Sequence, residues 1–313
     1  MKKIAFLFPG QGSQKVGMGK ELAEAQDQAK AIFDAADQVS GLPISKLCFE
    51  GPMEELTQTV NLQPAVTAVN LAFLTAIEQK GVKPHVCAGH SLGEYSALRA
   101  AGIVSTEDCI RLVHKRGELM HREALRNTGA MSAIIGMDID QVAQVVNEAA
   151  ASGVVAVANH NSGEQIVITG APDAVAKAGE LAAARGAKAI ALKVSGAWHS
   201  PLISGAEADF KSFLADIPFN APRCPVIHNV TAGTEADPSQ IRALMAKQLR
   251  SPVRWFDTIL KMVEEQIEIY VEIGPGRVLT GLLRKILPKD TAAATYNVYD
   301  LKTLDKFIQA VAI

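Results

Sequence analysis

Two short apolar runs near the start of the chain set the first structural expectation. Residues 3–8 (KIAFLF) end at Pro9, and residues 85–88 (HVCA) lead into a glycine-rich motif. Near-continuous apolar runs that stop at turn signals are typical of strands buried on both faces of a parallel sheet. Helical patterns occupy residues 20–39 and 63–80 between them. This alternation of strand and helix predicts an α/β fold with a parallel sheet.

The pattern changes at about residue 129. In order, the segments are typical of a strand (130–137), a helix (138–151), two strands (154–161 and 164–170), a helix (172–186) and a strand (187–195). The order βαββαβ is that of the ferredoxin-like arrangement. We therefore expect residues 129–196 to form a small inserted subdomain, and residues 1–128 and 197–313 to form the α/β catalytic domain.

The last third of the chain returns to mixed helix and strand. Helices are expected near 205–214, 238–249 and 253–265, and the apolar run at 267–274 (IEIYVEIG) predicts one more buried strand. No internal repeat, biased linker or long charge block interrupts these segments.

Composition excludes several classes of protein. The chain has 313 residues, 48% of them hydrophobic and 20% charged, with a net charge of −2. This balance is typical of a globular protein and gives no overall positive field for nucleic acid or an anionic membrane. No apolar run is long enough to span a bilayer, and the first residues are too short and too soon broken for a signal peptide, so we expect a cytoplasmic protein.

The cysteines give no sign of a disulfide framework or a metal site. They are far apart, without a CxxC pair or a cluster of zinc spacing, and we interpret them as reduced core residues: Cys48, Cys87, Cys109 and Cys224. We therefore expect no metal.

Ser91 is the first candidate for chemistry. It lies between Gly89 and Gly93 in GHSLG, after an expected strand and before an expected helix, which is the context of a nucleophile elbow. The helix beginning at Leu92 would point free N–H groups at an oxyanion beside Ser91. The same elbow serves hydrolases, so a hydrolase-like core is expected. The alternative is that Ser91 only caps the helix.

A serine nucleophile needs a base, and seven histidines compete for that role. His199 is the best placed, because it lies on a loop-like stretch (GAWHSPL) where the inserted segment rejoins the main domain. A satisfied core or surface histidine is the alternative, and His90 is expected to be scaffold. No carboxylate stands out as a third member, since Asp108 and Asp138 are explained as helix caps. We therefore expect a Ser/His dyad.

Five segments together resemble the malonyl-CoA:acyl carrier protein transacylases of fatty acid synthesis: FPGQGSQ (8–14), GHSLGEYSAL (89–98), KRGELM (115–120), GAWHSPL (196–202) and EIGPGRVLTGL (272–282). The resemblance implies transfer of a malonyl group from malonyl-CoA to the phosphopantetheine thiol of acyl carrier protein, through a malonyl-serine. It also implies no bound cofactor, because CoA arrives as part of the donor.

The resemblance assigns roles to individual residues. In it, Ser91 is the nucleophile and His199 the general acid and base. The remaining roles are an oxyanion hole from the N–H groups of Gln11 and Leu92, a carboxylate partner in Arg116, a histidine-orienting carbonyl in Gln248, and substrate contacts from Gln63 and Trp198. Arg116 alone, on a helix-like stretch, would otherwise be interpreted as a solvated arginine.

Three alternatives remain open at this point. One is a serine esterase or thioesterase, and another is a free-standing acyltransferase of a polyketide synthase. The third is a catalytically silent scaffold subunit. The family resemblance also suggests a monomer.

Overall fold

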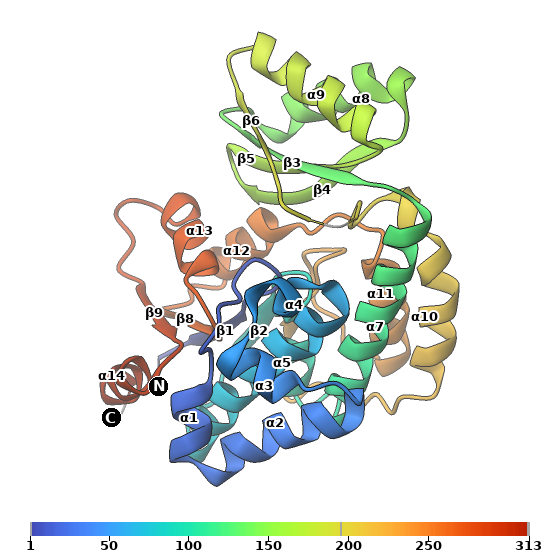
Figure 1. Cartoon of the computed structure of the whole chain (residues 1–313). Helices are drawn as coiled ribbons and strands as arrows, with labels where there is room; N and C mark the ends of the chain where they lie inside the picture. The colour runs from blue at the N-terminus through green and yellow to red at the C-terminus, as the bar shows by residue number, and fades with distance from the viewer. Residues whose placement is uncertain (1, 195, 312–313) are drawn as a thin grey trace.

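The computed structural model describes residues 2–194 and 196–311, and its centre is a five-stranded sheet (Figure 1). The strand order is β7 (Val226–Ile227), β2 (Val86–Gly89), β1 (Ile4–Phe8), β8 (Ile269–Ile273) and β9 (Ala294–Val298). Every neighbouring pair is parallel. The strands β1, β2 and β8 are buried on both faces, which explains their apolar runs. The expected α/β class with a parallel sheet is confirmed.

A second, antiparallel sheet lies above the first in Figure 1. Its strand order is β4 (Val155–Ser162), β5 (Gln165–Gly170), β3 (Ala130–Ile135) and β6 (Lys188–Ala191). Helices α8 (Ile139–Ala149) and α9 (Pro172–Ala184) cover its far face. Chain order is therefore strand, helix, two strands, helix, strand, as the sequence predicts.

The two sheets are joined by more than the two chain crossings. Met131, Ala133 and Val167 on the near face of the second sheet belong to the main hydrophobic cluster. The edge strand β4 also pairs with the main body, because the His160 N–H donates to the Val253 carbonyl (2.9 Å). This contact fixes the second sheet over the segment that leads into α12.

Helices cover both faces of the parallel sheet. They are α1 (Lys20–Ala25), α2 (Asp27–Ser40), α3 (Ile44–Glu50), α4 (Met53–Thr57), α5 (Thr59–Gln79), α6 (Gly93–Ala100), α7 (Thr106–Arg126), α10 (Gly205–Ala215), α11 (Pro238–Gln248), α12 (Trp255–Glu264), α13 (Val278–Ile286) and α14 (Leu301–Val311). Short 3₁₀ turns occur at η1 (Ala150–Ser152) and η2 (Pro201–Ile203). Helix α5 is long and apolar enough to span a membrane, but 89% of that stretch is buried, as expected of a core helix.

Several expected boundaries are wrong. The single helix expected at 20–39 is two helices, because Gln26 adopts an extended conformation between α1 and α2. The expected strand at 187–195 is only four residues long in β6, and Ser195 lies outside the described residues. The helix expected from residue 63 begins a turn earlier, at Thr59, with Pro64 inside it.

Candidate active site

Ser91 lies on a sharp turn at the carboxyl end of β2, immediately before α6. Its φ is 52°, in the left-handed region that non-glycine residues rarely adopt. The flanking glycines are required by close packing: a Cβ on Gly93 would lie 1.9 Å from the Phe8 carbonyl oxygen, and a Cβ on Gly89 would lie 2.0 Å from Gly93. The turn therefore raises the serine above the sheet edge as a nucleophile elbow does.

Ser91 has two polar partners on its hydroxyl. The Oγ atom lies 2.7 Å from His199 Nε2 and 3.0 Å from Arg116 Nη2. His199 comes from the turn that precedes η2, also with a positive φ of 60°, and Arg116 comes from the middle of α7. Three segments far apart in the sequence thus meet at one oxygen atom.

The orientation of His199 is fixed from its other nitrogen. Nδ1 lies 3.1 Å from the carbonyl oxygen of Gln248 and 2.9 Å from that of Ser251. Carbonyl oxygens only accept, so Nδ1 carries the hydrogen and Nε2 offers its lone pair to the Ser91 hydroxyl. Gln248 is the last residue of α11, and the carbonyls at a helix end have no partner within the helix. Ser251 was missed by sequence reasoning.

The surroundings keep His199 uncharged. Its pKa is lowered to about 3, first by burial and further by the positive charge of Arg116 and the neighbouring His90. The hydrogen bonds to the two carbonyls raise the pKa, but by less. A neutral imidazole with a free Nε2 can take a proton from the serine at neutral pH.

Arg116 is a buried cation, with 1% of its side chain exposed. Nη1 donates to Gln63 Oε1 on α5 (2.7 Å), and the guanidinium lies over the Tyr95 ring at 5.6 Å. Within the described residues no carboxylate lies within ion-pair distance of it, and burial lowers its pKa against the opposing effects of Tyr95 and the more distant Glu94. A buried charge without an ion pair is costly, so the site favours an anion beside Ser91.

Two free donors lie next to the elbow. Among the described residues, neither the Gln11 nor the Leu92 N–H donates to a protein acceptor. The loop after β1 and the elbow are in close contact, because a Cβ on Gly10 would lie 2.5 Å from the His90 carbonyl and 3.5 Å from Leu92 N. The two N–H groups are therefore on adjoining segments at the same sheet edge.

Trp198 and His90 lie near the site without joining the Ser91 contacts. Trp198 is 4% exposed and packs in the main core, with its ring against Gly196. His90 Nε2 lies 2.7 Å from Asn161 Oδ1, and its ring lies edge-on to Trp255. His90 thus connects the elbow to the second sheet, which agrees with a scaffold role.

Sequence reasoning missed a buried polar group beneath the elbow. Asn229, two residues after β7, accepts from the Ser91 N–H (2.7 Å) and donates to the Gly89 carbonyl (2.7 Å). Glu94, on the first turn of α6, lies 2.9 Å from His228 Nδ1. Asn229 is 138 residues from Ser91, and no local signal points to it; adjacency of the parallel strands β2 and β7 would be needed.

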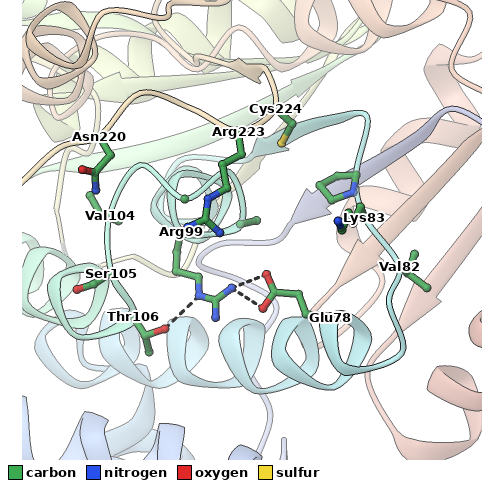
Figure 2. Close-up of a pocket in the computed structure, with 13 residues that line it drawn as sticks. Glu78, Val82, Lys83, Arg99, Val104, Ser105, Thr106, Asn220, Arg223 and Cys224 are labelled. Atoms are coloured by element: carbon green, nitrogen blue, oxygen red, sulfur yellow. Dashed lines mark hydrogen bonds and ion pairs between the residues drawn. The ribbon is translucent and has the colours of Figure 1, made fainter.

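A separate pocket lies away from the Ser91 contacts. It has a volume of about 710 Å³ and lies at the opposite end of β2, between the last turns of α5 and α6 and the first turn of α7. Figure 2 shows Arg99 spanning it to reach Glu78, an ion pair of 2.5 Å that neutralises this arginine. None of the candidate site residues lines it. The candidate active site is therefore identified by the contacts of Ser91 and not by this pocket.

The described residues contain no group of three or more His, Cys, Asp or Glu side chains able to hold a metal. The Cys87 and Cys224 sulfurs lie 3.7 Å apart as free thiols.

The site thus combines a serine on an elbow, a histidine held by main-chain carbonyls and a buried arginine, and the chain that carries it matches a known protein family. The model of the acyl transferase domain matches residues 5–302. The chain is 44% identical to the malonyl CoA-acyl carrier protein transacylase of Bacillus subtilis, over 99% of this chain and 98% of that protein. The chain therefore belongs to the malonyl CoA-acyl carrier protein transacylases within the acyl transferase family.

Two solved structures are similar along nearly the whole chain. An acyl carrier protein S-malonyltransferase from Vibrio cholerae has a TM-score of 0.92 and 42% identity, over 98% of this chain and 100% of that one. A type II PKS acyl-carrier protein in complex with its malonyl-transacylase gives a TM-score of 0.94 and 38% identity, over 99% and 100%. The family expected from the sequence motifs is confirmed.

Proposed function

We propose that this protein transfers the malonyl group of malonyl-CoA to the phosphopantetheine thiol of acyl carrier protein, for use as an extender unit in fatty acid synthesis. The observation that carries this proposal is Arg116, a buried cation 3.0 Å from the Ser91 hydroxyl that has no ion pair among the described residues. An acyl group that ends in a carboxylate matches it, because a planar guanidinium binds a carboxylate through two hydrogen bonds.

The first half-reaction loads the serine. Ser91 Oγ attacks the thioester carbonyl carbon of malonyl-CoA while His199 Nε2 takes the hydroxyl proton. The new oxyanion accepts hydrogen bonds from the Gln11 and Leu92 N–H groups. The carbon–sulfur bond then breaks, and the departing CoA sulfur receives the proton from His199. A malonyl-serine ester remains.

The second half-reaction repeats these steps with a different thiol. The phosphopantetheine sulfur of acyl carrier protein attacks the ester carbonyl, and His199 Nε2 takes the thiol proton. The carbon–oxygen bond breaks, and the proton returns to Ser91. Gln248 keeps the imidazole oriented throughout, through its main-chain carbonyl. Gln63 holds Arg116, and Trp198 shapes the acyl pocket.

No metal or organic cofactor takes part in these steps, and Ser91, His199 and Arg116 supply the chemistry themselves. We also propose that the protein acts as a cytoplasmic monomer. Residues 1–128 and 197–313 form a hydrolase-like catalytic domain in this proposal, and residues 129–196 an inserted ferredoxin-like subdomain. The sheet order β4-β5-β3-β6 and the element order support that assignment.

A polyketide pathway is the second candidate, because one similar solved structure contains a type II PKS acyl-carrier protein. The two candidates share the loading step and differ in the acceptor. Transfer rates to a fatty acid carrier protein and to a polyketide carrier protein separate them. A strong preference for the polyketide carrier would replace the first proposal.

Intact-protein mass after brief incubation with malonyl-CoA tests the loading step. The wild-type mass should rise by one malonyl group, and that of Ser91→Ala should not. Release of free CoA without an adduct would indicate a hydrolase. No adduct and no free CoA would return Ser91 to the role of a helix cap.

A further inference from the structure

Glu94 is a buried carboxylate that the loading and transfer steps leave without a task. It lies three residues after Ser91, on the first turn of α6, with 1% of its side chain exposed. A carboxylate is rarely buried unless several donors surround it. The donors around Glu94 are His228 and Asn229, which follow β7, and Gln248, at the end of α11.

One carboxylate oxygen holds the strand side of the site. Oε1 accepts from His228 Nδ1 (2.9 Å) and from the Asn229 N–H (3.3 Å). The Asn229 side chain in turn accepts from the Ser91 N–H and donates to the Gly89 carbonyl. Through Asn229 alone, Glu94 Oε1 is thus connected to the backbone that leads into the nucleophile, at Gly89 and at the Ser91 N–H.

The other carboxylate oxygen holds the histidine side. Oε2 accepts from Gln248 Nε2 at 2.7 Å, and the same amide nitrogen donates to the Ser91 carbonyl at 2.8 Å. The main-chain carbonyl of Gln248 accepts from His199 Nδ1. Gln248 therefore contacts Ser91 with its side chain and His199 with its main chain, and Glu94 fixes the side chain.

We propose that Glu94 is a positioning residue that sets the distance between Ser91 and His199 by clamping Gln248 and Asn229 at the same time. The inference rests on the proposed function only where malonyl loading is used to measure it. Glu94 does not reach the reacting atoms itself. Its effect passes through the hydrogen bonds that join the elbow to the carbonyl that holds the histidine.

The variant Glu94→Gln removes this arrangement with almost no change in volume. A glutamine presents one NH₂ group where the carboxylate has an oxygen. That NH₂ faces either Gln248 Nε2 or the Asn229 N–H, and both of these are donors. One of the two connections is lost in either orientation, and a buried donor is left unpaired.

Two readouts separate positioning from simple loss of stability. Single-turnover malonyl loading should slow about 10- to 100-fold in Glu94→Gln. The Kd for malonyl-CoA should change less than about threefold, because Arg116 keeps its contacts. By NMR, the His199 Nδ1–H proton should exchange with solvent about tenfold faster, since its carbonyl acceptor is no longer held. Glu94→Asp, which keeps two acceptor oxygens, should recover part of both.

Glu272 provides a matched control. It is also a fully buried carboxylate, and it accepts from the Leu279 and Thr280 N–H groups at the start of α13, away from the Ser91 contacts. Glu272→Gln should lower the melting temperature while loading rate and His199 proton exchange stay at wild-type values. Gln248→Met tests the same clamp from the other side, because it keeps the carbonyl and removes the amide.

Fast loading with slow proton exchange in Glu94→Gln would overturn the proposal, as would equal losses in Glu94→Gln and Glu272→Gln. If Glu94→Gln fails to fold, normal loading by Gln248→Met would overturn it instead. A wild-type protein that takes up no malonyl group would contradict the proposed function, whereas the proton-exchange comparison would still decide the role of Glu94.

Discussion

Replacement of Arg116 by methionine should convert a malonyl-selective site into one that no longer distinguishes malonyl from acetyl. Methionine retains most of the side-chain volume in a site that is 1% exposed, but it removes the charge beside Ser91. Loss of one member of a buried charge pair costs about 3 kcal/mol. At 1.4 kcal/mol per factor of ten, malonyl loading should slow about 100-fold.

Acetyl-CoA has no carboxylate, so the wild-type protein must keep Arg116 buried and unpaired when it loads acetyl. The Arg116→Met variant avoids this cost, and its acetyl loading should stay constant or become faster. Quenched-flow mass spectrometry with each donor gives both loading rates. Equal losses for malonyl and acetyl would show that Arg116 supports the fold of the site rather than the acyl carboxylate, and would refute the reasoning.

Two further predictions concern stability. Burial lowers the pKa of His199 to about 3 from 6.5, and His90 is lowered in the same direction, so the unfolded chain binds these protons first as the pH falls. The free energy of unfolding therefore loses the His199 contribution below pH 6.5, by about 2 kcal/mol between pH 8 and pH 5. Urea unfolding of His199→Asn should show a smaller difference in that free energy between the two pH values than the wild type shows. An unchanged difference would contradict the assignment. The second prediction compares two glycines. Gly93→Ala places a methyl group 1.9 Å from the Phe8 carbonyl oxygen and should destabilise the folded protein by more than about 3 kcal/mol. Gly281→Ala, in α13, meets no atom within 4 Å and should stabilise it by about 0.5–1 kcal/mol. Similar melting temperatures for the two variants would refute the packing argument at the elbow.

The sequence predicted the elements whose signal is local. β1 and β8 are apolar runs ended by Pro9 and Gly274, and the second sheet alternates with two amphipathic helices. β9 and α14 were not predicted. β9 (ATYNV) is a partly exposed edge strand that mixes polar and apolar residues, so its pattern is that of a loop. It becomes a strand because β8 offers a free edge.

The site residues also divide into those with a local sequence signal and those without one. Ser91 was singled out as a candidate because GHSLG is a local motif, and His199 because its loop follows a change of pattern. Asn229 and Ser251 act through contacts between distant parts of the chain, one by side chain and one by main-chain carbonyl. A carbonyl can come from any residue, so sequence alone contains no signal for it. Only the sheet order places these groups around Ser91.

The two carbonyls that hold His199 also have a consequence for the charge balance of the site. They orient the imidazole without a negative charge, and burial together with the positive charge of Arg116 lowers the pKa of His199 to about 3. When His199 takes the serine proton, the imidazolium therefore lies close to a second cation. The carboxylate of a bound malonyl group offsets this repulsion, so the acyl group itself favours the proton transfer that loads it.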